Sequence, residues 1–381
     1  MTDGGNAAQA VDAELAPAGA AALRDRAAGA LTRVLVGAGF LPVWLASAAM
    51  IAIAAIVAPE TLGNDSLSTV LPTMAVLAVA ALGEMLVIMM GGIDLSIPGT
   101  MTLAGLLTVG VSGGANGKLA VAIVVALAWS GLVGLGNGLL VGVAGLNPLI
   151  VTLAVGWIAL GVSLEYSYGI ANESSVPGTL SSWATDQLLG ASWFFWCGLA
   201  VAVLLAVGLR YTAAGRRFQA VGANPRAAWM AGMHVRSHVV FAYAAASVLY
   251  GGAGILLAGI IKFPTVDLGS PYLLGPIAAV VIGGASLAGG RASAMSTWAA
   301  AFGLTLLSQM LRVLNLSTAL QYVVFGIAIA AGMVISGDRI VGALGGLAQR
   351  PRVRAWIGAS GGEPADSEER REVFEEGAAS V

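Results

Sequence analysis

Long apolar segments alternate with short polar ones between residues 40 and 336, and this pattern predicts membrane-spanning helices. A helix that crosses a bilayer needs roughly 17–25 residues. Segments of this kind are expected at 40–58, 69–90, 98–113, 119–143, 148–170, 191–210, 239–261, 272–288, 293–314 and 318–336. The third and eighth are short, and either could be a re-entrant or tilted segment instead. The pattern therefore predicts an all-α polytopic bundle of about ten transmembrane helices, some of them short or broken.

Composition supports a membrane protein. Of the 381 residues, 58% are hydrophobic and only 10% are charged, whereas a soluble domain usually carries about 25% charged residues. The 53 glycines suit close packing of membrane helices. A single cysteine, Cys197, excludes an internal disulfide and a cysteine-based metal site. His234 and His238 lack a nearby acidic partner, which makes them a poor metal site. No cofactor or metal is expected.

Basic residues set the expected orientation. If the N-terminus is cytoplasmic and ten spans follow, the C-terminus is cytoplasmic too, and 15 of the 18 basic residues fall on that side. Only Lys118, Lys262 and Arg312 fall toward the other side, in accordance with the positive-inside rule. The expected organisation is a cytoplasmic tail at 1–39, a transmembrane domain at 40–337 with a cytoplasmic loop at 211–238, and a second cytoplasmic tail at 338–381.

A carboxylate stands between two apolar segments at residues 91–98. Gly91, Gly92 and Pro98 interrupt any continuous helix there, and Asp94 or Ser96 could cap the helix that restarts. Irregular backbone at membrane depth persists only where protein or a water-filled path covers it, and broken helices are common around translocation paths. The alternative is a short cytoplasmic turn with no further role.

The cytoplasmic loop 211–238 predicts a short helix. Asn224 is a good N-cap, Pro225 suits the first helical position, and Gly232 can end the helix in a left-handed conformation. The resulting helix of about two turns presents Trp229 and Met230. Such a helix is unstable alone in water, so it must pack either on its own membrane domain or on a partner. The residues leave both open.

Few charges lie within the apolar segments. Glu84 is well inside the second span, where a carboxylate is a functional candidate by default; otherwise it is a hydrogen-bonded packing residue. The remaining polar groups are mostly neutral, such as Asn137, Thr152 and Tyr250, which suits an uncharged polar solute or ordinary helix packing. The glycine-rich stretch 283–291 lacks the lysine of a phosphate loop, so ATP hydrolysis by this chain is not expected. A weak match between Leu146-Asn147 and Leu314-Asn315 is compatible with an inverted repeat.

Four segments in order resemble the membrane permeases of the ribose/xylose/galactoside branch of ABC importers. They are Gly91–Ser96, Asn147–Leu153, Ala278–Gly290 and the cytoplasmic loop Gly215–Gly232. The likeness runs from about residue 40 to 337. The chain departs from the family pattern in having Ile97-Pro98 after the first motif, and Leu149 and Ala154 in the second. These departures bear on the solute rather than on the family.

The resemblance implies a permease without a catalytic site, located in a bacterial inner membrane. Its implied partners are cytoplasmic ABC ATPase subunits, an extracytoplasmic solute-binding protein and a second permease subunit, expected to be a second copy of this chain, within membrane lipid. The solute would be a sugar or a sugar-like neutral molecule. The residues expected to contact the ATPase are Arg216, Arg217, Asn224, Pro225, Arg226, Trp229 and Met230. The residues expected along the translocation path are Glu84, Asp94, Ser96, Asn147, Thr152, Gly283 and Gly284.

A competing hypothesis is an ATP-independent secondary carrier for a small neutral solute, supported by the polytopic composition and by Glu84. The isolated cytoplasmic helix and the four family-like segments favour the ABC permease instead. A membrane-embedded enzyme has no support, because no paired carboxylates, Ser/His/Asp set or metal cluster occurs at one membrane depth.

Overall fold

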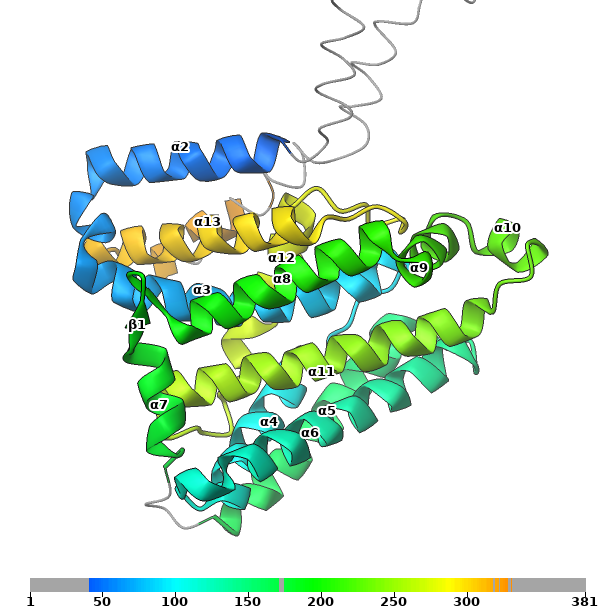
Figure 1. The fold of residues 1–381 in the computed structure, drawn as a ribbon, viewed down its shortest axis with the longest axis horizontal. Helices are drawn as coiled ribbons and strands as arrows, with labels where there is room; N and C mark the ends of the chain where they lie inside the picture. The colour runs from blue at the N-terminus through cyan, green and yellow to red at the C-terminus, as the bar shows by residue number, and fades with distance from the viewer. Residues whose placement is uncertain (1–40, 171–174, 318, 322, 328–329, 331–381) are drawn as a thin grey trace, which may run out of the picture. The chain divides into compact units, whose positions relative to one another are not determined.

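Helices make up most of the described chain, and its two strands are only two residues each (Figure 1). The computed structural model describes residues 41–170, 175–317, 319–321, 323–327 and 330. The elements are α2 (Leu41–Val57), η1 (Pro59–Leu62), α3 (Asn64–Met89), α4 (Ile97–Ser112), η2 (Asn116–Lys118), α5 (Leu119–Gly142), α6 (Pro148–Tyr168), α7 (Gly178–Thr185), β1 (Gln187–Leu188), β2 (Ala191–Ser192), α8 (Trp193–Tyr211), α9 (Ala213–Ala223), α10 (Pro225–Met230), α11 (Val235–Ile261), η3 (Ser270–Tyr272), α12 (Gly275–Ile282) and α13 (Ala294–Val313).

The prediction of an all-α polytopic membrane protein is confirmed. Within the described residues, five helices are long and apolar enough to cross a membrane, namely Asn64–Met89, Asn116–Gly142, Pro148–Tyr168, Trp193–Tyr211 and Val235–Ile261. A full span at 272–288 does not form, because α12 has only 8 residues and a helix of that length reaches about 12 Å, well short of a core of about 30 Å. The short helix leaves the re-entrant or tilted segment as the prediction for this stretch. The predicted span 318–336 falls largely outside the described residues, as do both tails.

Helix α3 is the most enclosed of the long helices. It packs against α11, α13, α8 and α12, and 89% of its most apolar stretch is buried. The corresponding stretches of α5, α6 and α8 are only 22–28% buried. Their exposed residues are largely apolar, which is the surface that lipid or another membrane subunit covers. The described transmembrane region is therefore organised around α3.

Small residues bring α5 and α11 together, as the glycine content predicts. A Cβ added to Gly138 would lie 2.7 Å from the Val240 Cα, and one on Gly134 would meet the Tyr243 carbonyl oxygen. The two helices lie side by side in Figure 1. Elements that the sequence analysis missed lie in the connections: α7 and the β1–β2 hairpin between α6 and α8, and α9 within the 211–238 loop.

Candidate functional site

The predicted helix break is present between α3 and α4. Residues 90–96 join Met89 to Ile97 without helical structure, and Gly91 has a φ of +77°. Asp94 and Ser96 are completely buried, so protein covers this irregular backbone, as a break at membrane depth requires. The short cytoplasmic turn stays the alternative. The predicted cap is wrong, because the N-terminus of α4 has no side-chain cap bond. The Asp94 Oδ1 instead accepts two hydrogen bonds from Ser96, one from the Ser96 backbone N–H at 2.8 Å and one from the Ser96 hydroxyl at 2.6 Å.

Glu84 holds this break from inside α3. Its Oε1 accepts from the Asp94 backbone N–H at 3.2 Å, and its Oε2 accepts from the Tyr250 hydroxyl of α11 at 2.8 Å. Glu84 and Tyr250 are both fully buried. Among the residues described, no basic side chain forms an ion pair with either carboxyl group. Hydrogen bonds from neutral donors therefore offset part of the free-energy cost of burying the two acidic groups.

Two further helices, α5 and α6, form hydrogen bonds with residues of the α3–α4 break. The Asn137 Nδ2 of α5 donates to the Ser96 Oγ at 3.0 Å, and the Leu95 N–H donates to the Thr152 Oγ1 of α6 at 2.9 Å. Thr152 in turn donates to the Pro148 carbonyl oxygen at 2.9 Å. Side chains from α3, α5, α6 and α11 thus converge on seven residues of irregular backbone. We name Glu84, Asp94, Ser96, Asn137, Thr152 and Tyr250 the break cluster.

Tyr243 and Ser247 were not among the predicted site residues, and they lie on α11 two turns and one turn before Tyr250, respectively. The Tyr243 hydroxyl, the Ser247 Oγ and the Asp94 Oδ2 are buried without a hydrogen-bond partner in the described part of the chain. A Cβ on Gly92 would meet the Tyr243 hydroxyl, which places that tyrosine against the break. The spacing of Tyr243, Ser247 and Tyr250 was the available signal, because residues at i, i+4 and i+7 share one helix face.

The remaining predicted path residues lie elsewhere. Asn147 is exposed and caps α6, with its Oδ1 accepting from the Leu149 N–H at 2.9 Å. Gly283 and Gly284 directly follow α12, and a Cβ on Gly283 would lie 3.0 Å from the Thr297 Cα. The structure therefore brings Glu84, Asp94, Ser96 and Thr152 together but leaves these three apart from them.

The glycine-rich turn after α12 contacts the end of α3. The Gly290 N–H donates to the Met89 carbonyl oxygen at 2.9 Å. Gly222 of α9 packs on the same oxygen, because an added Cβ there would meet it directly. Only residues without a Cβ allow three backbones to come this close. The 211–238 loop is thus joined to the last residue of α3, directly before the break.

The predicted short helix is confirmed as α10. The Asn224 Oδ1 accepts from the Ala227 N–H at 3.0 Å, and Gly232 has a φ of +79°. Of its apolar residues, Ala228 is buried whereas Trp229 is 72% exposed and Met230 is 77% exposed. Arg216 and Arg217 belong to the separate helix α9, which the sequence analysis missed. The Thr212 Oγ1 caps α9 by accepting from the Gly215 N–H at 2.9 Å.

A hollow of about 780 Å³ lies between α10 and the start of α11. Its lining includes Pro225, Arg226, Trp229, Met233 and Arg236. Large exposed apolar side chains beside basic ones, on a helix that projects beyond α9 (Figure 1), are typical of a protein-binding surface.

Apolar spans, a broken helix held by buried polar groups and a projecting helix in a connecting loop define an integral membrane protein of the transporter class. The chain belongs to the family described as the branched-chain amino acid transport system / permease component, whose model matches residues 66–336. The expectation of an ABC importer permease from the sequence resemblance is confirmed at the level of the family.

Similar proteins come from several bacteria. The chain is 31% identical over 281 residues to a probable ABC transporter permease, y4mJ, of Sinorhizobium fredii, with 73% of this chain and 83% of that protein covered. It is 28% identical to the ribose import permease RbsC of Escherichia coli K12 (76% and 91% covered) and 31% identical to RbsC of Bacillus subtilis (75% and 89% covered). No solved structure matches the chain.

Proposed function

We propose that this chain is the membrane-spanning subunit of an ABC importer in a bacterial inner membrane, and that it translocates a sugar or a sugar-like neutral solute. The relatives named ribose import permeases support the solute class. The observation that carries the proposal is the contact of α9 with the end of α3, because it joins the projecting helix α10 to the helix break. ATP hydrolysis belongs to separate ATPase subunits, and an extracytoplasmic binding protein supplies the solute.

In this mechanism, α10 sits in a groove of the ATPase. Trp229 and Met230 supply apolar anchors, and Arg216, Arg217 and Arg226 supply polar contacts, with Asn224 and Pro225 setting the start of the helix. Closure of the ATPase moves α10 and, with it, α9. Since Gly222 packs on the Met89 carbonyl oxygen, this movement reaches the α3–α4 break and biases the permease between two states.

The break cluster acts by fixing the α3–α4 segment beside the path. Glu84, Asp94, Ser96 and Thr152 are each buried within one chain, so they shape the path wall rather than line an open channel in this conformation. A second copy of the chain completes the path. Asn147, Gly283 and Gly284 remain predicted path residues. In the proposed orientation, both termini and α10 are cytoplasmic.

The second candidate is the ATP-independent carrier, and the observation that favours it is the buried Glu84–Asp94 pair. Carriers driven by protons use buried acidic groups of this kind. Both oxygens of Glu84 are already occupied by hydrogen-bond donors within the chain, at 3.2 and 2.8 Å. This favours a structural use of Glu84, and the ABC permease remains the better supported function.

The test is co-purification from the native membrane in mild detergent, with bound proteins identified by mass spectrometry. We expect an ATPase subunit to accompany the wild-type chain and to be lost from Pro225→Ala/Arg226→Glu. The control is Lys118→Glu, which makes the same charge change at an exposed position of η2. Recovery of the chain without an ATPase in several mild detergents, together with uptake by liposomes that lack ATP, would establish the carrier instead.

A further inference from the structure

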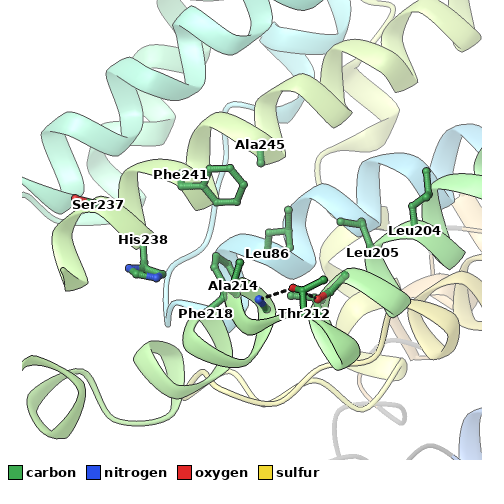
Figure 2. A pocket seen from close by; sticks show the side chains of 13 residues that line it. Leu86, Leu204, Leu205, Thr212, Ala214, Phe218, Ser237, His238, Phe241 and Ala245 are labelled. Atoms are coloured by element: carbon green, nitrogen blue, oxygen red, sulfur yellow. Dashed lines mark hydrogen bonds between the residues drawn. The ribbon is translucent and has the colours of Figure 1, made fainter. Parts of the chain in front are cut away.

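A second cavity lies between α8, α9 and α11, separate from the break cluster. It has a volume of about 420 Å³ and is lined mainly by apolar side chains (Figure 2). Leu204, Leu205, Phe241 and Ala245 line its walls, and Leu86 of α3 also contributes. Sites that bind small ligands have volumes of roughly 300–1,000 Å³. The break cluster takes no part in this groove, and the groove meets the hollow beside α10 at Ser237.

The groove has one apolar end and one polar end. Its lining follows α8 from Leu204 to Thr212 and follows α11 from Ala245 back to Ser237. Thr212 lies on one side of the groove, and Ser237 and His238 lie on the other, where the 211–238 loop begins and finishes (Figure 2). Leu204 and Phe241, farther along, are 71% and 62% exposed. An apolar channel that opens on the exposed side of membrane helices and ends in polar groups matches an acyl chain with its headgroup.

On the described helices α8 to α11, which form most of the groove, every formally charged side chain is basic. Residues 193–261 contain five arginines and two histidines but no acidic side chain. Arg210 adjoins the lining residue Leu209, Arg236 adjoins Ser237, and both arginines are exposed. The acidic residues of α3 are Asp65, in its first turn, and Glu84, which is buried with both oxygens hydrogen bonded. The groove is thus complementary to an anion.

We propose that this groove binds an anionic phospholipid, with an acyl chain between α8 and α11 and its phosphate beside Arg210 and Arg236. Basic pockets between membrane helices are the sites that select anionic headgroups. Because Gly215 and Phe218 of α9 also line the groove, the bound lipid stabilises the position of α9 against α8 and α11. The inference does not depend on the ATPase partnership.

Gly208 offers a direct test, because it lines the groove and a Cβ added to it would meet nothing within 4 Å. Gly208→Leu should fill the groove without disturbing the backbone. Gly136→Leu on α5 is the matched control, since Gly136 is also a half-buried helical glycine with open space around its added Cβ. Arg210→Gln/Arg236→Gln tests the headgroup separately, and Lys118→Gln at the exposed η2 is the control for loss of charge.

The measurement is native mass spectrometry of the full-length chain in mild detergent, titrated with phosphatidylglycerol or phosphatidylcholine of identical acyl chains. We expect the wild type to retain phosphatidylglycerol preferentially, Gly208→Leu to lose most of it, and Gly136→Leu to keep it. One arginine near a membrane surface contributes about a fivefold preference for anionic lipid, so the double arginine variant should lose roughly 25-fold in selectivity and Lys118→Gln none.

Equal retention of the two lipids by the wild type would overturn the proposal, and so would unchanged phosphatidylglycerol binding by Gly208→Leu. If Gly208→Leu instead abolished a dimer without changing lipid retention, the groove would be a contact between two copies of this chain. If Gly208→Leu did not fold, the test would rest on Arg210→Gln/Arg236→Gln. An unchanged preference of that variant for phosphatidylglycerol over phosphatidylcholine would contradict the headgroup site.

Discussion

Two tyrosines on the same face of α11 allow the break cluster to be tested by a matched pair of substitutions. Tyr243 and Tyr250 are almost completely buried, at 1% and 0% exposure. The Tyr250 hydroxyl donates to the Glu84 Oε2 at 2.8 Å, whereas the Tyr243 hydroxyl has no partner in the described part of the chain. Tyr250→Phe and Tyr243→Phe therefore remove the same atom from similar surroundings, and they differ in the hydrogen bond that is lost.

The expected magnitudes follow from these contacts. A hydrogen bond to a charged group contributes about 1.5–3 kcal/mol to stability, but side-chain bonds between membrane helices average about 0.6 kcal/mol. Because Glu84 is fully buried and would lose one of its two donors, we expect Tyr250→Phe to lower the free energy of unfolding by about 1.5 kcal/mol. Tyr243→Phe removes an unpaired polar atom, so its effect should stay within about 0.5 kcal/mol or be stabilising.

The assay is reversible unfolding in mixed detergent micelles, followed by tryptophan fluorescence. A third variant, Glu84→Gln, completes a double-mutant cycle with Tyr250→Phe. If Tyr250 acts through Glu84, its loss should cost less stability in the Glu84→Gln background than in the wild type. Equal losses for the two phenylalanine variants, or a larger loss for Tyr243→Phe, would refute the assigned role of the Tyr250–Glu84 bond.

Two further predictions concern transport and coupling. Glu84→Gln should retain substantial solute uptake in reconstituted vesicles, because the proposed solute is neutral and the amide keeps the shape of the carboxyl group; complete loss of uptake at normal expression would favour a charge-dependent mechanism. Gly222→Ala should destabilise the fold by about 1–3 kcal/mol through overpacking, because its Cβ would meet the Met89 carbonyl oxygen. The destabilisation would appear as a lower midpoint of thermal unfolding, and uptake should depend less on ATP. Gly136→Ala, where a Cβ meets nothing within 4 Å, is the control; equal effects of the two would exclude a specific role for the α9–α3 contact.

Features that depend on local sequence were largely predictable. The apolar periodicity located the long helices to within a few residues, because a membrane core demands a minimum apolar length. The break at Gly91 and the caps at Asn224 and Gly232 follow from single-residue backbone preferences, and each is present in the structure. The errors also have local causes. The short helix α9 was missed because its glycines and arginines resemble a loop, and α12 was overextended because the apolar sequence continues past its end.

What the sequence by itself determined is the class of the protein, its long helices, the helix break and the family. Hydropathy, turn residues and ordered motifs are local properties of the sequence, so they can be recognised without knowing which distant residues are in contact. Only the tertiary structure decided what those features do together: Glu84 meets Tyr250, which is 166 residues away, and Gly222 meets Met89 and Gly290 at one point. Such meetings depend on how helices pack, because buried polar groups must find partners wherever the fold places them.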